Sequence, residues 1–170
     1  MVFSSVLFLF LFLPVFMLVY QLLARKFRNI WALIASLFFY AWGAPLFLFV
    51  VSGTIIIDFF IVKKIHHSDN DKLRKRLLAL SVFIKVGLLA YFKYANFFVE
   101  NVDAILVFFG FDSIHWTQVA LPIGISFFTF QALTYSVDVY RKVHAPLKSL
   151  ADYLLYILLF PQLIAGPIVR

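Results

Sequence analysis

Two charged side chains, Asp58 and Lys85, lie deep inside apolar stretches of this sequence. At 1.5 Å per residue of helix, they lie about 7 and about 12 Å from the polar run that separates the two stretches. A charge in the middle of a membrane helix costs about 2.5–3.5 kcal/mol on insertion scales, so such residues usually pair with one another. We therefore predict an ion pair between Asp58 and Lys85 on neighbouring antiparallel helices. The pair either holds the helices together or belongs to a functional site.

A second group of polar residues recurs at helical spacing. Gln131, Tyr135 and Asp138 are four and three residues apart, which places them on one face of a helix. In an apolar helix such a face is predicted to point into a bundle, where it lines either a substrate path or a hydrogen-bonded core. Arg141, which follows one turn after Asp138, is the candidate partner of that carboxylate.

The remaining reactive side chains do not form a catalytic or metal-binding pattern. All four histidines lie in predicted loops, and the adjacent His66 and His67 lack the i, i+4 spacing of metal ligands on a helix. Ser126 and Thr129 have no basic neighbour that would activate a hydroxyl group. The absence of cysteine excludes thiolate chemistry and disulfides. We therefore predict no metal site and no complete active site in this chain.

The composition indicates which solvent these residues meet. The chain is 64% hydrophobic and 14% charged, whereas a soluble domain is roughly half apolar with about a quarter of its residues charged. A mean hydropathy of +0.99 also indicates a lipid environment. The net charge of +7 comes from basic residues beside bilayer-length apolar stretches, where they meet anionic headgroups. The lipid bilayer is therefore the predicted partner, and nucleic acid is not.

The basic residues also predict a topology. Thirteen of the fifteen Lys and Arg residues lie in runs at 25–28, 63–76 and 141–148 and at Arg170, and the connections opposite these runs have none. The positive-inside rule places the runs in the cytoplasm. Because no basic residue precedes the first apolar stretch, we predict a retained first span, not a signal peptide, with the N-terminus outside.

Apolar length and helix breakers divide the chain into elements. About 20 apolar residues are needed for a helix to cross the bilayer. Pro14 predicts a kink, and Pro161 interrupts the last helix after about 16 Å, which predicts a re-entrant element. The fold class is therefore predicted to be all-α, a polytopic transmembrane helical bundle. The predicted elements are spans at 5–24, 29–42, 45–62, 77–95 and 119–139, a loop at 63–76, an interfacial helix at 97–110 and a broken or re-entrant helix at 150–168.

Four segments resemble a known family. They are MVFSSVLFLFLFLPVF at the start of the chain, YFKYANFF at 91–98, LPIGISFFTFQALTYSVDVYR at 121–141 and LLFPQLIAGPIVR at 158–170. In this order the chain resembles the N-terminal part of the bacterial membrane-bound O-acyltransferase (MBOAT) family, in the branch that contains the alginate O-acetyltransferase membrane subunit.

The resemblance implies a function. The intact protein would take acetyl, or another acyl group, from a cytoplasmic thioester donor such as acetyl-CoA, with no bound cofactor. It would transfer the group across the bacterial inner membrane for O-acetylation of an extracytoplasmic polysaccharide such as alginate. An extracytoplasmic acetyltransferase would be its partner protein. The readings that the sequence leaves open are a non-catalytic membrane assembly protein and a fragment of a transporter.

The resemblance also limits the assignment of residues. The family's catalytic histidine belongs to a region downstream of the GPIVR segment, and none of the four histidines here matches it. We therefore expect an N-terminal fragment that is inactive alone and contains no catalytic residue. Five residues are candidates for the bundle interior or for lining a path in the intact protein: Gln131, Tyr135, Asp138, Gln162 and Arg170.

Overall fold

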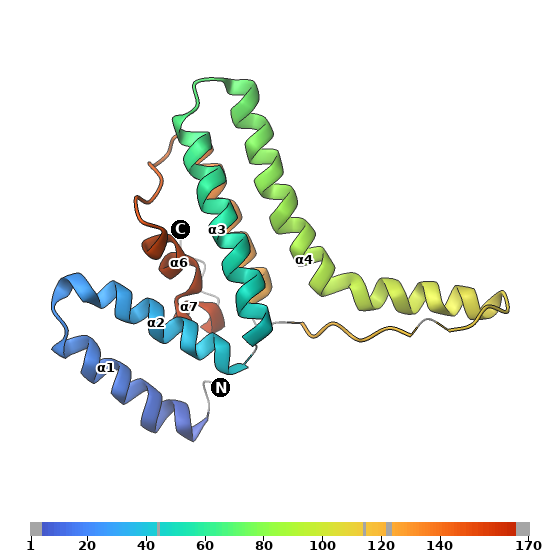
Figure 1. The fold of residues 1–170 in the computed structure, drawn as a ribbon, viewed down its shortest axis with the longest axis horizontal. Coiled ribbons are helices and arrows are strands. Elements are labelled where there is room, and N and C mark those ends of the chain that lie inside the picture. Colours follow the sequence, from blue (N-terminus) through green and yellow to red (C-terminus); the bar gives the residue numbers. More distant parts are fainter. Residues whose placement is uncertain (1–4, 44, 114, 122–123, 166–170) are drawn as a thin grey trace.

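The computed structural model describes residues 5–43, 45–113, 115–121 and 124–165. Its regular elements are all helical across these residues, so the all-α prediction is confirmed. A π-helical segment, η1, precedes seven α-helices (Figure 1). The elements are η1 (Phe8–Phe12), α1 (Leu13–Leu22), α2 (Arg25–Gly43), α3 (Pro45–His67), α4 (Asp71–Phe108), α5 (Ile125–Tyr140), α6 (Leu150–Leu158) and α7 (Phe160–Ala165).

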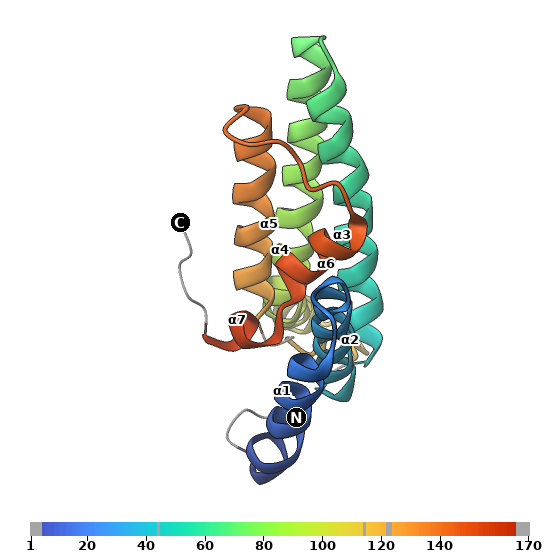
Figure 2. The same ribbon diagram turned by 90° about the vertical axis from the view of Figure 1, so that its left-hand side faces the viewer.

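The centre of the molecule is a bundle of α3, the first part of α4 and α5, with α6 packed beside it (Figures 1 and 2). The buried residues of α3 recur every three or four positions and meet a matching face of α5. Tyr153, Ile157 and Leu158 of α6 complete this core. The members from α3 and α5 are Phe47, Val51, Ile55, Phe59, Val62, Ile125, Phe128, Ala132, Tyr135 and Val139.

The first two helices form a separate hairpin beside the bundle (Figure 1). Phe8, Phe12 and Phe16 pack against Phe39 and Phe160, with ring centroids 5.1–6.2 Å apart. The predicted irregularity at Pro14 takes the form of the π-helical turn that precedes it, and the proline itself lies in the first turn of α1. The π-helical turn changes the backbone pairing just before the proline, with Leu13 N–H donating to Phe8 O, and so accommodates a residue that has no N–H to donate.

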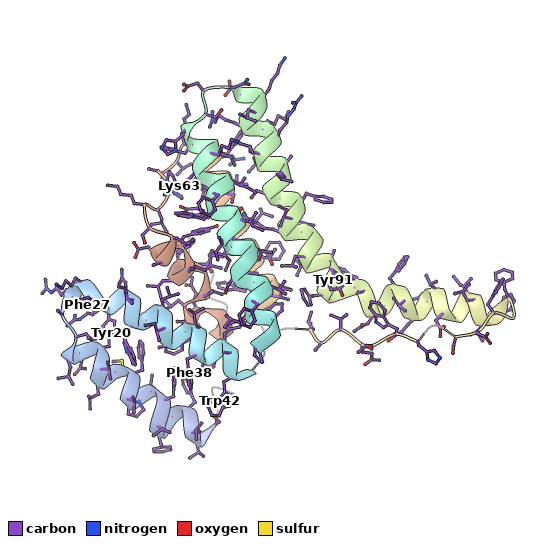
Figure 3. All side chains as sticks on the ribbon, in the orientation of Figure 1. Tyr20, Phe27, Phe38, Trp42, Lys63 and Tyr91 are labelled. Carbon is purple, nitrogen blue, oxygen red and sulfur yellow. The ribbon has the colours of Figure 1, made fainter. Side chains whose placement is uncertain are left out.

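Helix α4 differs from the prediction at both ends. The connection before it is reduced to residues 68–70, so most of the predicted loop at 63–76, including His66 and His67, is helical. Asn70 makes this short turn sufficient, because its Oδ1 accepts the N–H groups of Lys72 and Leu73 at 3.0 and 3.3 Å. The predicted span 77–95 and helix 97–110 are one continuous helix, which changes direction near Tyr91 (Figure 3).

The part of α4 beyond this bend projects from the bundle, with residues 111–113 and 115–121 running back along it (Figure 1). We call residues 94–113 and 115–121 the arm. Asn96 joins its two segments: its Nδ2 donates to Val119 O at 2.8 Å, and its Oδ1 accepts Val119 N–H at 2.9 Å and Trp116 Nε1–H at 3.0 Å. The base of the arm is therefore fixed by three hydrogen bonds from one side chain.

Helix α5 begins later than predicted. The predicted span started at residue 119, but the helix starts at Ile125, after Gly124 with φ 80°. Two features of the sequence explain the late start. Leu121 precedes Pro122, and the residue before a proline disfavours helical backbone angles. Gly124 has a positive φ, which glycine accepts without strain. Its 16 residues extend about 24 Å, which is less than the hydrocarbon thickness.

Among the residues that the structure describes, α4 is the one helix both long and apolar enough to cross a membrane. Phe8–Leu22 and Leu150–Gln162 are apolar but shorter. The broken or re-entrant helix predicted at 150–168 begins as α6, which follows the N-cap Ser149. A break at Leu159 separates α6 from α7. Residues 166–168 of that prediction lie outside the described part of the chain.

Candidate functional site

Four helices contribute to one buried polar cluster: Asp58 from α3, Ser81 and Lys85 from α4, Ser136 from α5 and Tyr153 from α6. We call these five residues the polar cluster. Asp58 is 4% and Lys85 7% exposed, and the other three are 1% exposed or less. Ser81 and Lys85 are four residues apart, so they share the face of α4 that meets α3 and α5.

The two charges of the cluster lie in direct contact. Lys85 Nζ is 2.8 Å from Asp58 Oδ1, and it also donates to Ala132 O at 2.8 Å and to Ser81 Oγ at 3.0 Å. A third hydrogen bond to a side chain joins Lys85 to Ser136. Burying an ammonium group is tolerable only when such partners replace water. Here the partners come from three helices.

The Asp58 carboxylate is equally well provided with partners. Ser81 Oγ donates to Oδ1 at 2.6 Å, and Tyr153 Oη donates to Oδ2 at 2.5 Å. Ser136 Oγ lies 3.4 Å from Oδ2. The bonds from Ser81 and Tyr153 have the lengths of charge-assisted O–H to carboxylate bonds, which are about twice as strong as neutral ones, whereas the Ser136 contact is longer. The cluster therefore ties the short helix α6 to the centre of the bundle.

The sequence predicts the two charges but not their three neutral partners. Ser81 has a signal in the sequence, its i, i+4 spacing to Lys85. Ser136 adjoins Tyr135 but lies outside the predicted stripe of Gln131, Tyr135 and Asp138. Tyr153 had no signal, because a tyrosine in a short apolar helix has many other uses.

The structure separates the three residues of that stripe. Tyr135 is buried, and its hydroxyl accepts Leu147 N–H at 2.7 Å. Gln131 is partly exposed, and its Nε2 donates to Tyr156 O at 2.8 Å. The Asp138 side chain is 35% exposed, and His144 Nε2 lies 4.0 Å from its Oδ2; among the described residues, no ion pair joins Asp138 to Arg141. These three positions do not form a continuous interior face.

The face of α5 that is buried among the described residues includes Tyr135 but neither Gln131 nor Asp138. Its members are Ile125, Phe128, Thr129, Ala132, Tyr135, Ser136 and Val139. Of the two remaining candidates, Gln162 is partly exposed and its backbone N–H donates to Leu159 O at 3.0 Å. Arg170 lies outside the described residues.

The polar cluster is organised for cohesion more than for reaction. Its hydroxyl groups are almost fully buried, and Lys85 is held by a carboxylate, so no free base lies beside a free nucleophile. A separate groove of about 400 Å³ lies between the first hairpin's two helices, and its lining is entirely apolar. Phe38 and Trp42 mark its lower part in Figure 3. Within the described residues, no group of three or more His, Asp or Glu could hold a metal ion.

Basic side chains join the helices at the end of the bundle that carries the Ser68–Asn70 turn. Arg74 Nε donates to Ile65 O at 3.3 Å, and its terminal nitrogens contact Asp71 Oδ1 and Tyr140 O. Arg74 thereby meets the carbonyl ends of both α3 and α5, where a positive charge is favourable. In the same region, Lys63 Nζ donates to Lys148 O at 3.1 Å.

Two comparisons with known proteins gave no match: no family model matches the chain, and no solved structure does. Curated proteins do match. The chain is 42% identical over 171 aligned residues to the probable alginate O-acetylase AlgI of Pseudomonas putida, with all of this chain and 35% of that protein covered. The same identity is found with AlgI of Pseudomonas aeruginosa, 33% of which is covered. The peptidoglycan O-acetyltransferase of Helicobacter pylori is 34% identical, with 37% covered.

An all-α chain with a charged pair between its helices, and with one helix able to cross a bilayer, is consistent with a membrane protein. Its relatives are bacterial O-acetyltransferases. The chain is a relative of the alginate O-acetylases, and the predicted resemblance to that branch of the membrane-bound O-acyltransferases is confirmed. It spans about a third of the length of the curated relatives it matches.

Proposed function

We propose that this chain is part of a membrane-bound O-acyltransferase that moves acetyl groups from a cytoplasmic thioester donor to an extracytoplasmic polysaccharide. The observation that carries the proposal is the identity of 42% along the whole chain to a probable alginate O-acetylase. The donor is acetyl-CoA or another acyl thioester, and the acceptor is alginate or a related polymer. An extracytoplasmic acetyltransferase completes the transfer.

The chain's own contribution in this proposal is the framework that holds the transfer path. Its polar groups are engaged in helix contacts, so they position helices while the reacting groups lie elsewhere in the protein. Excluding water from such a path restrains hydrolysis of the acyl group. Tight packing of α3, α4, α5 and α6 supports this role.

A test of the function measures acetyl groups on the exported polymer. Disrupting the gene in the host cell is expected to abolish O-acetylation, measured as acetyl groups per amount of polymer recovered. Restoring the intact gene should restore acetylation. Radiolabelled acetyl-CoA given to sealed inverted vesicles should label the polymer, whereas the same donor outside right-side-out vesicles should not. Full acetylation in the disrupted strain would refute the function, and labelling from the other side would refute the direction.

The proposed topology is multi-pass in the bacterial inner membrane, with the N-terminus and the arm outside. Contacts between segments with basic residues support a common cytoplasmic side: Asn29 Nδ2 is 3.2 Å from Asp152 Oδ1, and Lys63 and Arg74 reach the 140–148 region. The arm fits the outer interface, because residues 94–140 contain no Lys or Arg. Its exposed aromatic residues include Tyr94, Phe97, Phe98, Phe108, Phe109, Phe111 and Trp116.

Cysteine labelling tests this topology: these 170 residues contain no cysteine, and any cysteine elsewhere in the protein is first replaced by serine. Ser113→Cys, on the arm, is expected to react with a membrane-impermeant maleimide in intact cells. Ser68→Cys, in the turn before α4, should react only after the membrane is permeabilised. Ser113 is exposed and Ser68 is half-buried, so the labelling of each position after permeabilisation serves as the reference for its own reactivity. Labelling of both positions in intact cells would contradict the topology.

A further inference from the structure

The break between α6 and α7 is bridged by side chains from two other helices. In a continuous helix Phe160 N–H would donate to Tyr156 O, four residues earlier. Leu159 adopts φ −58° and ψ 114°, which is not helical, and the two backbone groups separate. Phe160 N–H donates instead to Ser36 Oγ at 3.2 Å, and Tyr156 O accepts Gln131 Nε2–H at 2.8 Å. One hydrogen bond of the helix is thus replaced by two from outside it.

Ser36 is oriented for this contact. It is fully buried on α2, and its hydroxyl hydrogen is committed to Ala32 O at 2.7 Å. The lone pairs of the same oxygen are therefore left to accept Phe160 N–H. The ring of Phe160 is itself buried among the aromatic residues of the first hairpin. Helix α2 thus holds the first residue of α7 by both its backbone and its side chain.

Gln131 approaches the break from α5. A carbonyl oxygen can only accept, so the contact with Tyr156 O fixes which end of the amide is the NH₂ group. The ring of Tyr156 also lies 5.7 Å from that of Tyr135, one turn after Gln131 on α5. Tyr153, one turn before Tyr156, is anchored to Asp58. The last turn of α6 is therefore held on the side of α5 and α3.

These contacts matter because unpaired backbone groups are costly at membrane depth. Irregular backbone survives there only where protein or water provides partners. Pro161 has no N–H and cannot continue the hydrogen bonding of α6, but a proline alone usually leaves a helix kinked, with the chain still running on. Here the chain turns at Leu159, and α7 points away from the α6 axis (Figure 2).

We propose that Ser36 and Gln131 are positioning residues that hold the chain broken at Leu159 and so set the direction of α7. This proposal rests on the proposed function, in which α6 and α7 form a re-entrant wall of the acyl-transfer path. The residues act through backbone groups and touch no reacting atom. Pro161 is then permissive, and the two side chains determine where the backbone turns.

Distance measurements on the full protein in membranes test the proposal. Spin labels at Ile34→Cys in α2 and Gln162→Cys in α7 report the position of α7; these 170 residues have no native cysteine, and any elsewhere in the protein is replaced by serine to keep the labelling specific. In the parent, one narrow distance is expected. Pro161→Ala alone should leave that distance unchanged, because Ser36 and Gln131 still hold the break. Adding Ser36→Ala and Gln131→Met should shift it, because the helix can then continue from α6 into α7.

The expected size of the shift in distance follows from the measured strengths of hydrogen bonds between membrane helices. Each such bond corresponds to roughly a 3- to 20-fold change in the ratio of the two conformations. With both removed, the shifted distance should dominate. Gln131→Met with Pro161→Ala should give a mixture of the two distances. Of the two bracing side chains, this variant removes only the partly exposed Gln131 and keeps the buried Ser36. Thr134→Ala is the matched control, since its hydroxyl donates to Phe130 O within α5 at 2.9 Å.

Two outcomes would overturn the proposal. A shift already present in Pro161→Ala alone would make the proline the determinant. An unchanged distance in the triple variant, and no mixture in the Gln131→Met variant, would show that other contacts hold the break. The turnover of acetyl transfer should fall in proportion to the fraction of molecules that keep the parent distance, while the KM for the donor stays constant. Shifted distances without any acetyl transfer in the parent would refute the proposed function and leave the positioning role intact.

Discussion

Lys85→Met is expected to destabilise the folded protein by about 3 kcal/mol, because it leaves the Asp58 carboxylate buried without its cation. Asp58 is 4% exposed, so water cannot replace the ammonium group without opening the bundle. The removed side chain also takes one of the two side-chain donors from Ala132 O, which keeps Ser136 Oγ at 3.0 Å, and it leaves Ser81 Oγ without the Lys85 hydrogen bond. The measurement is reversible unfolding in mixed detergent micelles, followed by circular dichroism.

The double variant Asp58→Asn with Lys85→Met should recover most of the lost stability, because a neutral amide replaces the unpaired charge. Lys93→Met is the matched control on the same helix. Lys93 is exposed and lies over the ring of Tyr94, so its loss should cost less than about 0.5 kcal/mol. Equal losses from Lys85→Met and Lys93→Met would mean that the buried pair contributes nothing.

Arg74→Leu is expected to cost about 2–3 kcal/mol, because it removes charged hydrogen bonds at the carbonyl ends of two helices. The Arg74 side chain is 10% exposed and lies over the ring of Tyr140, with 5.1 Å from Cζ to the ring centroid. Ile65 O and Tyr140 O would lose their donor. The same unfolding measurement applies, and hydrogen exchange should accelerate in the last turn of α5.

Arg74→Lys should restore less than half of this loss, because an ammonium group cannot present the planar fork that reaches both carbonyls. Arg76 provides the control: it is an exposed arginine two residues away, and Arg76→Leu should change stability by less than about 0.5 kcal/mol. A loss from Arg76→Leu as large as that from Arg74→Leu would indicate a general effect of the basic segment. The specific contacts would then be unimportant.

The sequence could predict features that depend on composition or on single residues. The all-α class follows from long apolar stretches punctuated by few breakers, and the break near Pro161 follows from the missing N–H of proline. The resemblance to O-acyltransferases depended on whole segments, and identity along the full chain supports it. Asp58 and Lys85 stood out because an isolated charge is costly in an apolar stretch.

Element boundaries were less predictable. Residues 97–110 are predicted to be a separate interfacial helix, because Glu100, Asn101 and Asp103 lie opposite an apolar face. Residues 94–98 contain no Gly or Pro, however, so the helix continues and only its direction changes. The 63–76 stretch was expected to be a loop because of its charge, yet Lys and Arg are good helix formers and Asn70 is an efficient cap.

The sequence by itself determined that this chain is apolar and helical, that it is interrupted near residue 160 and that it carries a buried charge needing a partner. Only the tertiary structure decided which face of α5 points inward and which hydroxyls meet the charges. The reason is physical: a helix that is apolar nearly all round has no strong preference for one face, so its neighbours select the face that packs. Ser36, Ser136 and Tyr153 acquire their roles only when α2, α5 and α6 are brought together.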